Sequence, residues 1–321
     1  LMYRGAVMET VLVTGGAGFI GSHLCESLLK EGSQVFCLDN LSAGKQDNIR
    51  HLEENSDFKF IKGDIREINE CSNQFNPIDY IFHDAAFVSV FDSVKNPILC
   101  NQINVEGTLQ VLEYARQTGV KRLIFASSAA IYGDDPSLPK KENQFTIPSS
   151  PYGVSKQAAE SYVINYNELY DLETAALRYF NVFGPRQSDS GYSGVLSIFS
   201  KLILDNKPPT IFGDGYQTRD FIYVKDIVAG NLAAMKSKDA PGGIFNIGTG
   251  QPTKLIDITN DLLEICNRKE LQIIFDEPRP GDVKESYADI TRARKILGFE
   301  PKYSVKEGLM EYIKYKRSRE R

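Results

Sequence analysis

The stretch that decides the fold is Thr10-Val11-Leu12-Val13-Thr14-Gly15-Gly16-Ala17-Gly18-Phe19-Ile20-Gly21. Its first five residues form a largely apolar run of strand length, and Ser22 to Lys30 have a helix-like pattern. A strand, a glycine turn and a helix in this order open the βαβ unit that binds dinucleotide phosphates. Gly15 would allow the tight turn, Gly18 would let the backbone approach a pyrophosphate, and Gly21 would permit close packing of helix on strand.

The next strand-like run indicates which dinucleotide is bound. Gln34 to Leu38 follows the predicted helix and ends at Asp39. An acidic side chain at this place can accept hydrogen bonds from the adenosine ribose hydroxyls and repels a 2′-phosphate. Asp39 therefore favours NAD over NADP as the cofactor.

Strand-like runs and helical patterns alternate along the first half of the chain, which predicts a parallel sheet covered on both faces. We expect a helix from Asn104 to Thr118 and place further strands at Phe58–Ile61, Tyr80–His83, Arg122–Ala126 and Thr174–Tyr179. In such sheets ligands bind at the carboxyl ends of the strands. The candidate site positions all fall at or just beyond such ends: Gly15, Asp39, Ala85 and Ser128.

The chain changes in texture after Asn181, where turns rich in Gly and Pro are mixed with short helices. We predict an α/β protein with a Rossmann-type doubly wound parallel sheet over residues 8–180, rejoined by about residues 222–250. Residues 181–221 and 251–321 would form a smaller α/β substrate-binding lobe. Residues 1–7 are left out of this reasoning, because Leu1 to Glu9 is too short and polar for a secretory signal and could be an extension before a start at Met8.

The pair Tyr152 and Lys156 is the candidate acid and base. Pro151 favours a helix start, so a helix from Tyr152 to Tyr170 would place both side chains on one face. An unperturbed tyrosine ionises near ~10, and a lysine ammonium one turn away would lower that pKa toward neutral pH. Ser128 could bridge the tyrosine and a reacting substrate oxygen.

Composition excludes several other functions. The 321 residues carry a formal net charge of −5, so there is no basic bias toward nucleic acid. The five cysteines include no Cys-x-x-Cys pair and the three histidines lack metal-ligand spacing, so we expect no disulfide framework, no metal and a reducing cytoplasm. No apolar run approaches the ~20 residues that span a bilayer, so no membrane association is expected.

The chain resembles an extended short-chain dehydrogenase/reductase, and within that superfamily the UDP-glucose and UDP-N-acetylglucosamine 4-epimerases. The resemblance runs nearly end to end. Its motifs are Thr14–His23, Asp39-Asn40, Gly63-Asp64-Ile65-Arg66, Asn104–Thr108, Ser127-Ser128-Ala129, Tyr152–Lys156, Arg178–Arg186, Gly213–Asp220, Phe245–Gly248 and Arg279-Pro280-Gly281-Asp282-Val283.

This resemblance implies a tightly held NAD and a set of residues for it. The glycine turn with Phe19 and Ile20 would bind the pyrophosphate, Asp39, Asn40 and Gly44 the adenosine side, and Asp64 and Ile65 the adenine. Ala85, Ala86 and Asn104 would line the remaining path, Lys156 would bind the nicotinamide ribose, and Phe180 would lie near the nicotinamide. The nucleotide sugar would be held by Ser128, Asn181, Val195, Leu196, Thr210, Phe212, Arg219, Arg279, Asp282 and Ser286.

By the same resemblance we expect epimerisation through transient oxidation at the sugar C4, with Tyr152 as base and Ser128 as relay. The family also implies a homodimer that packs through helices near Asn104 and Tyr152. A small Ser286 would leave room for a 2-N-acetyl group, so both plain and N-acetylated UDP-hexoses are expected substrates.

Three alternatives stay open. Nucleotide-sugar 4,6-dehydratases have an Asp-Glu pair after the hydroxyl residue where this chain has Ala129-Ala130. Decarboxylases typically carry a glutamate in the same stretch, which is also missing. A catalytically silent NAD-binding module is disfavoured by the intact Ser128, Tyr152 and Lys156.

Asp84 departs from the family pattern by placing an extra carboxylate near the cofactor path.

Overall fold

The computed structural model describes residues 8–188, 194–278 and 284–319. Its centre is a seven-stranded sheet in which every pairing is parallel. In spatial order the strands are β11 (Gly243–Ile247), β6 (Glu173–Tyr179), β5 (Arg122–Ser128), β4 (Tyr80–His83), β1 (Thr10–Thr14), β2 (Gln34–Asp39) and β3 (Phe58–Lys62). The predicted Rossmann-type sheet is confirmed.

The strand order reverses between β1 and β4. The chain runs outward from β1 through β2 to β3, and then crosses to β4 on the other side of β1. At such a switch point the connections leave in opposite directions and open a crevice at the carboxyl ends of the strands. Gly15 and Ala85, which follow β1 and β4, therefore lie side by side at this crevice.

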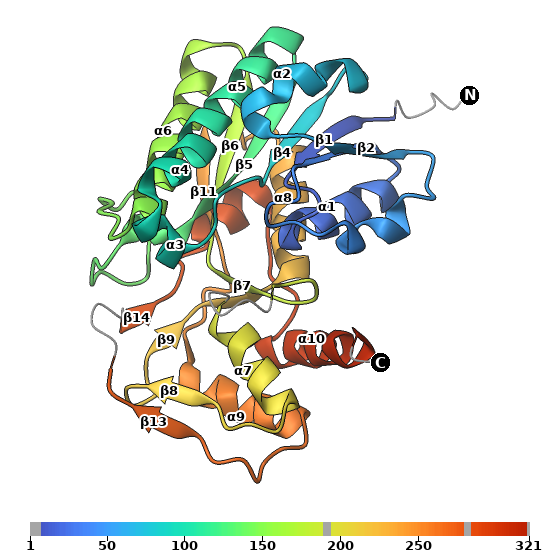
Figure 1. Ribbon diagram of the computed structural model, residues 1–321. Coiled ribbons are helices and arrows are strands. Elements are labelled where there is room, and N and C mark those ends of the chain that lie inside the picture. Colours follow the sequence, from blue (N-terminus) through green and yellow to red (C-terminus); the bar gives the residue numbers. More distant parts are fainter. Residues whose placement is uncertain (1–7, 189–193, 279–283, 320–321) are drawn as a thin grey trace, which may run out of the picture.

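Helices cover both faces of the sheet, as Figure 1 shows. One face carries α1 (Phe19–Lys30) and α8 (Val224–Lys236), and the other carries α5 (Gly107–Thr118) and α6 (Pro151–Leu169). Successive side chains of β1 enter different cores, since Val11 and Val13 pack in the cluster with α1 and α8 whereas Leu12 packs in the cluster with α5 and α6. Burial on both faces explains why the strands read as apolar runs.

The helices begin close to where the sequence predicts. The hydroxyl of Ser150 accepts a hydrogen bond from Gly153 N at 3.1 Å, which caps α6 one residue before Pro151. The predicted helix from Asn104 is in fact two elements, a π-helical turn over Gln102–Glu106 followed by α5. Shorter helices are α2 (Ile68–Cys71), α3 (Val90–Lys95), α4 (Pro97–Asn101) and a 3-10 turn at Ala129–Tyr132.

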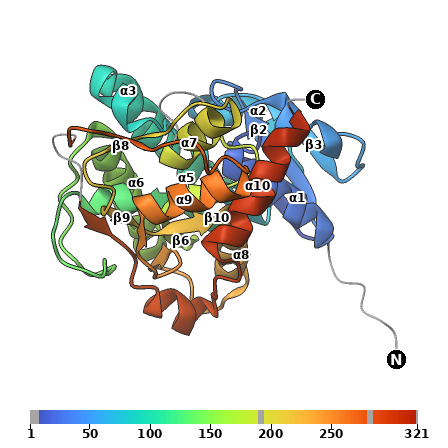
Figure 2. The same cartoon turned by 90° about the horizontal axis from the view of Figure 1, so that it is seen from below.

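The remaining elements lie beyond the carboxyl ends of the sheet (Figure 1). They form three small sheets: β7 (Asn181–Phe183) with β10 (Phe221–Tyr223), β9 (Thr218–Arg219) between β12 (Thr253–Lys254) and β14 (Glu285–Ser286), and β8 (Thr210–Phe212) with β13 (Ile274–Asp276). Three helices accompany them, and α9 (Leu255–Ile265) packs against both α7 (Val195–Leu204) and α10 (Val305–Arg319), as Figure 2 shows from below. We refer to these elements as the lower lobe.

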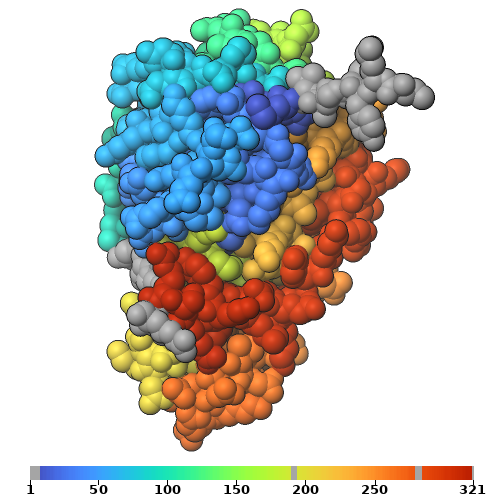
Figure 3. Space-filling model, turned by 90° about the vertical axis from the view of Figure 1, so that its right-hand side faces the viewer, coloured from blue at the N-terminus to red at the C-terminus, as the bar shows by residue number. Residues whose placement is uncertain are grey.

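The lower lobe and the sheet share packing at the glycine turn. Phe19 and Ile20, which begin α1, pack against the apolar core of the lower lobe. Arg186, just after β7, donates to the Glu26 carboxylate of α1 at 2.7 Å. Figure 3 shows the C-terminal residues lying across the junction between the amino-terminal half and residues near 260. Within the described ranges, no helix is both long and apolar enough to cross a bilayer.

Candidate active site

The glycine turn leaves no space for side chains where a dinucleotide would approach. Gly15 has φ +70, and a Cβ there would lie 2.6 Å from Ala85 N. A Cβ on Gly18 or Gly21 would lie 2.9 or 2.3 Å from the Gly15 carbonyl oxygen. The turn is therefore a bare backbone surface at the start of α1, and it fits the pyrophosphate of NAD.

Asp39 lies at the end of β2 and is only 8% exposed. Its carboxylate accepts hydrogen bonds from Ala17 N at 3.0 Å and Leu41 N at 2.7 Å, while burial raises its pKa. A Cβ at Gly44 would collide with this carboxylate at 2.7 Å. Asp39 thus ties the glycine turn to the segment after β2 and still has lone pairs for ribose hydroxyls.

The residues predicted to lie beside the adenine also contact one another or their neighbours. Asn40 donates to Asp64 at 2.9 Å, and Asp64 forms an ion pair with Arg66 at 2.8 Å. The hydrogen bond from Arg66 lowers the pKa of Asp64 to about 2. Ile65 follows with 5% exposure, packed beneath Gly107 of α5.

Asn104 holds the segment that follows β4. Its amide accepts from Phe87 N at 2.7 Å and donates to Phe87 O at 3.0 Å and to Ser155 Oγ at 2.9 Å. These bonds fix the backbone after Ala85 and Ala86, which remain half-buried. Asn104 therefore shapes the cofactor path through Phe87.

Ser128 and Tyr152 meet at the end of β5 and the start of α6. The Ser128 hydroxyl accepts from Ala130 N at 3.1 Å and lies close enough to the phenol of Tyr152 to affect its pKa. Burial raises the pKa of Tyr152, and Ser128 opposes that rise only in part. The pKa therefore differs from the low value expected of a lysine-stabilised tyrosine, because desolvation outweighs the nearby groups.

Lys156 lies one turn along α6 and is 3% exposed. Its ammonium donates to the Ala126 carbonyl oxygen at 2.7 Å and lies 4.8 Å from the centre of the Phe125 ring. Burial lowers its pKa to about 8, and the strongest opposing effect is the charge of Asp84. The ammonium is thus held by β5 rather than exposed on a helix surface.

Asp84 lies at the end of β4 facing this pair. Burial raises its pKa to about 7, while Lys156 and Tyr179 lower it. The Tyr179 hydroxyl lies 3.4 Å from Oδ1 of Asp84 and donates to Asn231 at 2.8 Å. Oδ2 of Asp84 is buried without a hydrogen-bond partner. The residue therefore acts on Lys156 through its charge.

The expected sugar-nucleotide residues lie in the lower lobe and at its junction with the sheet. Phe180, which was expected near the nicotinamide, follows β6 directly and is buried against Ile131 and Tyr132. Asn181 is exposed at the start of β7, and Thr210 and Phe212 belong to β8.

Arg219 of β9 pairs in register with Ser286 of β14. Val195 and Leu196 begin α7, where the Leu196 side chain is buried in the lobe core and leaves only its backbone for a ligand. Arg279 and Asp282 lie outside the described residues.

Comparison with known proteins agrees with this arrangement. The model of the NAD dependent epimerase/dehydratase family matches residues 11–248. The chain belongs to this family. Its cofactor is NAD.

Several individual members of this epimerase/dehydratase family are similar over their whole length. A putative UDP-glucose 4-epimerase of Methanocaldococcus jannaschii is 42% identical over 97% of this chain and 99% of its own. The crystal structure of the Thermotoga maritima UDP-glucose 4-epimerase with UDP-glucose superposes with a TM-score of 0.91 at 39% identity, covering 97% and 100% of the two chains. A UDP-N-acetylglucosamine 4-epimerase from Methanobrevibacter ruminantium, in complex with UDP-N-acetylmuramic acid, gives 0.92 at 36% identity, covering 98% and 100%. A UDP-glucuronic acid decarboxylase of Arabidopsis thaliana is 33% identical, covering 96% of this chain but 70% of its own.

Sequence reasoning missed a buried polar cluster behind the catalytic residues of this family member. Glu160, one turn after Lys156, forms a bidentate ion pair with Arg178 of β6 at 2.7 and 3.0 Å. The same carboxylate accepts from Ser127 Oγ at 2.6 Å, and Arg178 also donates to the Tyr132 hydroxyl at 2.9 Å. The one available signal was spacing, since Glu160 continues the helical face of Tyr152 and Lys156.

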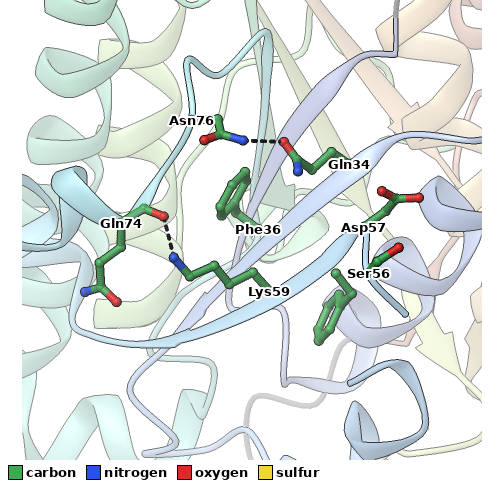
Figure 4. Close-up of a pocket in the computed structure, with 8 residues that line it drawn as sticks. Gln34, Phe36, Ser56, Asp57, Lys59, Gln74 and Asn76 are labelled. Atoms are coloured by element: carbon green, nitrogen blue, oxygen red, sulfur yellow. Dashed lines mark hydrogen bonds between the residues drawn. The ribbon is translucent and has the colours of Figure 1, made fainter. Parts of the chain in front are cut away.

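A pocket of about 240 Å³ lies elsewhere, at the amino ends of β2 and β3 (Figure 4). Its walls include Phe36, Lys59, which donates to Gln74 O, and Asn76, which donates to Gln34. The pocket is at the opposite end of the strands from Gly15, Ser128 and Asp84. It contains none of the predicted site residues and is not the site of the chemistry.

Proposed function

We propose that the protein is an NAD-dependent UDP-sugar 4-epimerase that interconverts UDP-glucose and UDP-galactose. The observation that carries the proposal is the placement of Tyr152 beside Ser128 at the carboxyl end of β5, with Lys156 one turn further along α6 and bonded to the same strand at Ala126 O. The named relatives of highest similarity support the same activity.

In this proposal NAD, when bound, supplies the acceptor for the hydrogen at the sugar C4 and the donor that returns it. Tyr152 takes the proton of the 4-hydroxyl, and Ser128, which lies close to the same phenol, orients that hydroxyl. Because burial raises the pKa of Tyr152, ionisation needs a positive charge close by. In this proposal the charge comes from the Lys156 ammonium, one turn further along α6 and bonded to Ala126 O. After inversion Tyr152 returns the proton.

We propose a substrate-binding lobe of residues 181–221 and 251–321, which includes most of the lower lobe, with residues 222–250 rejoining the sheet domain of 8–180. Within the second segment, Ala293, Leu297 and Phe299 pack in the core of the sheet domain. A protein with a net negative charge needs local cationic side chains to bind a diphosphate. Arg219, where three short strands pair, is suited to bind the diphosphate of the UDP-sugar. Holding the nucleotide in the lobe leaves the sugar free to turn above Tyr152. Arg279 and Asp282 are proposed for the same ligand on the resemblance alone.

Decarboxylation is the second candidate, because two relatives that are named as decarboxylases share 33% sequence identity with this chain. Elimination and decarboxylation call for an acidic group beside the hydroxyl residue, and here Ala129-Ala130 occupy that 3-10 turn. Asp84 is the nearby carboxylate, yet it lies directly after β4 with one oxygen buried, and its charge acts on the lysine. The site therefore favours epimerisation.

Product analysis separates these reactions. The purified protein is incubated without added NAD with UDP-glucose, and separately with UDP-glucuronate, and the products are resolved by proton NMR. We expect UDP-galactose from UDP-glucose and no UDP-pentose. Formation of a UDP-pentose with release of CO₂, or of a 4-keto-6-deoxy sugar, would replace epimerisation as the function.

We also propose a homodimer through α3, α4 and α6. These helices pack against one another on one side of the molecule (Figure 1). Their exposed apolar side chains are Val94, Ile98, Val154, Tyr162 and Leu169. Ile98 is 74% exposed, which is unfavourable in a monomer. Sedimentation should give a dimer for the wild type and a monomer for Ile98→Asp with Val154→Asp.

A further inference from the structure

Asp220 follows Arg219 directly and is fully buried, with 0% exposure. Oδ1 accepts hydrogen bonds from Thr249 N at 2.7 Å and Thr249 Oγ at 2.6 Å. Oδ2 accepts from Gly250 N at 2.9 Å and Ala288 N at 3.1 Å. One carboxylate therefore collects four donors from two distant segments of the chain.

These segments carry the residues that the proposed function assigns to the sugar nucleotide. Ala288 is two residues beyond Ser286, whose strand β14 pairs with β9 at Arg219. Thr249 and Gly250 lead into β12, which pairs with the other side of Arg219. The Asp220 carbonyl oxygen also accepts from Asn181 N at 2.9 Å. Asn181, Arg219 and Ser286 are thus all connected through this single residue.

Packing around the carboxylate leaves no room for adjustment. A Cβ on Gly248 would lie 2.7 Å from Oδ2 of Asp220 and 3.1 Å from the Ala288 side chain. Among the described residues the carboxylate has no cationic partner, and its pKa reflects burial opposed by the hydrogen bonds from Thr249, Gly250 and Ala288. The four donors are the interactions that compensate its burial.

We propose that Asp220 is a positioning residue for the nucleotide sugar: its carboxylate holds the segments of Asn181, Arg219 and Ser286 in the arrangement that binds the UDP-sugar. This inference rests on the proposed function. Asp220 acts through the backbone of these segments and does not itself contact the substrate.

The isosteric variant Asp220→Asn tests the proposal, because an amide cannot accept all four donors. Whichever way it is turned, its NH₂ group faces at least one backbone N–H, and a buried donor is left unpaired. We expect the KM for UDP-glucose and the Kd for UDP, measured by titration calorimetry, to rise about tenfold or more. The kcat at saturation and the NAD content of the purified protein should stay near wild type.

Thr249 supplies matched controls. Thr249→Val removes the shortest of the four hydrogen bonds and should raise the UDP Kd by a smaller factor, on the order of threefold. Thr249→Ser keeps the hydroxyl and should behave as wild type. If Asp220→Asn does not fold, the Val and Ser pair decides: equal UDP affinity in both overturns the proposal, and a weaker Val variant supports it.

Two results would overturn the inference in the folded Asn variant. One is unchanged UDP affinity beside a wild type that epimerises UDP-glucose, which rejects this role and leaves the proposed function standing. The other is a loss of UDP affinity in step with NAD content and melting temperature, which means general destabilisation. A wild type that neither binds UDP nor turns over UDP-glucose rejects the proposed function first, and the inference with it.

Discussion

The carboxylate of Asp84 is the group that most strongly favours the charged form of Lys156, against a burial that lowers the lysine pKa to about 8. The two residues come from different elements. Asp84 directly follows β4, Lys156 lies near the start of α6, and both belong to the candidate site. The proposed mechanism needs Lys156 as an ammonium, so its charge is expected to limit activity on the alkaline side.

A first prediction concerns Asp84→Asn. Activity should fall as the pH rises through the pKa of Lys156, because the lysine is charged only below that value. Removing the Asp84 charge lowers this pKa further, so the alkaline limb of kcat against pH should move to lower pH. Each unit by which the pKa falls reduces the charged fraction about tenfold at alkaline pH. Asp84→Glu keeps the charge and should retain the wild-type limb; a limb that stays in place or moves upward in the Asn variant would disprove the coupling.

The glycine turn provides the second prediction. In Gly21→Ala the new Cβ would meet the Gly15 carbonyl oxygen at 2.3 Å, so the turn must deform. We expect purified Gly21→Ala to contain little NAD, measured after acid release, and to regain little on addition of NAD. Gly194→Ala is the control, because the nearest atom to its Cβ among the described residues lies at 3.5 Å and its φ is −55. Full NAD content in Gly21→Ala would contradict this assignment of the turn.

The third prediction tests the buried ion pair of Glu160 and Arg178. Glu160→Gln leaves the guanidinium in the core without its counter-charge, and the free energy of unfolding should drop by about 3–5 kcal/mol. Urea titration measures the change. Glu300→Gln breaks an exposed pair with Arg294 and should leave stability unchanged within error. Equal effects of the two substitutions would show that the buried pair has no special structural role.

The fourth prediction concerns substrate breadth. Ser286 is half-buried in β14 beside Arg219, and we expect the wild type to accept UDP-N-acetylglucosamine as well as UDP-glucose. Ser286→Tyr should lower kcat/KM for the acetylated substrate at least about tenfold more than for UDP-glucose, because the ring fills space next to the sugar. Ser286→Ala preserves the space and should keep both activities. Equal losses on both substrates would place Ser286 away from the 2-position.

Local sequence signals were enough for the parts of the molecule that depend on neighbours in the chain. The run from Thr10 to Gly21 predicted β1, the turn and α1, and the strands at Tyr80 and Arg122 begin where expected. The position of Ser128 follows from the end of a parallel strand, and the positions of Tyr152 and Lys156 follow from their spacing on one helix. Each of these inferences needed only the spacing of residues along a helix or strand, the position of a glycine, or the end of a strand.

Long-range contacts were not predictable in the same way. Glu160 looks like an ordinary polar helix residue until β6 brings Arg178 against it, and Asp220 gives no sign of the donors at Thr249 and Ala288. The pKa of Tyr152 shows the same limit. Spacing placed a lysine nearby, but the depth of burial, which here raises that pKa, is set by the whole fold.

The central claim is that Tyr152 drives a transient oxidation at C4 with return of the same hydrogen to the same carbon. UDP-glucose carrying deuterium at C4 is therefore incubated with the protein without added NAD, and the product is analysed by proton NMR and mass spectrometry. The account predicts UDP-galactose that retains deuterium at C4 with the wild type, and no product with Tyr152→Phe. UDP-galactose that has exchanged this deuterium for solvent hydrogen, or near wild-type turnover by Tyr152→Phe, would contradict it.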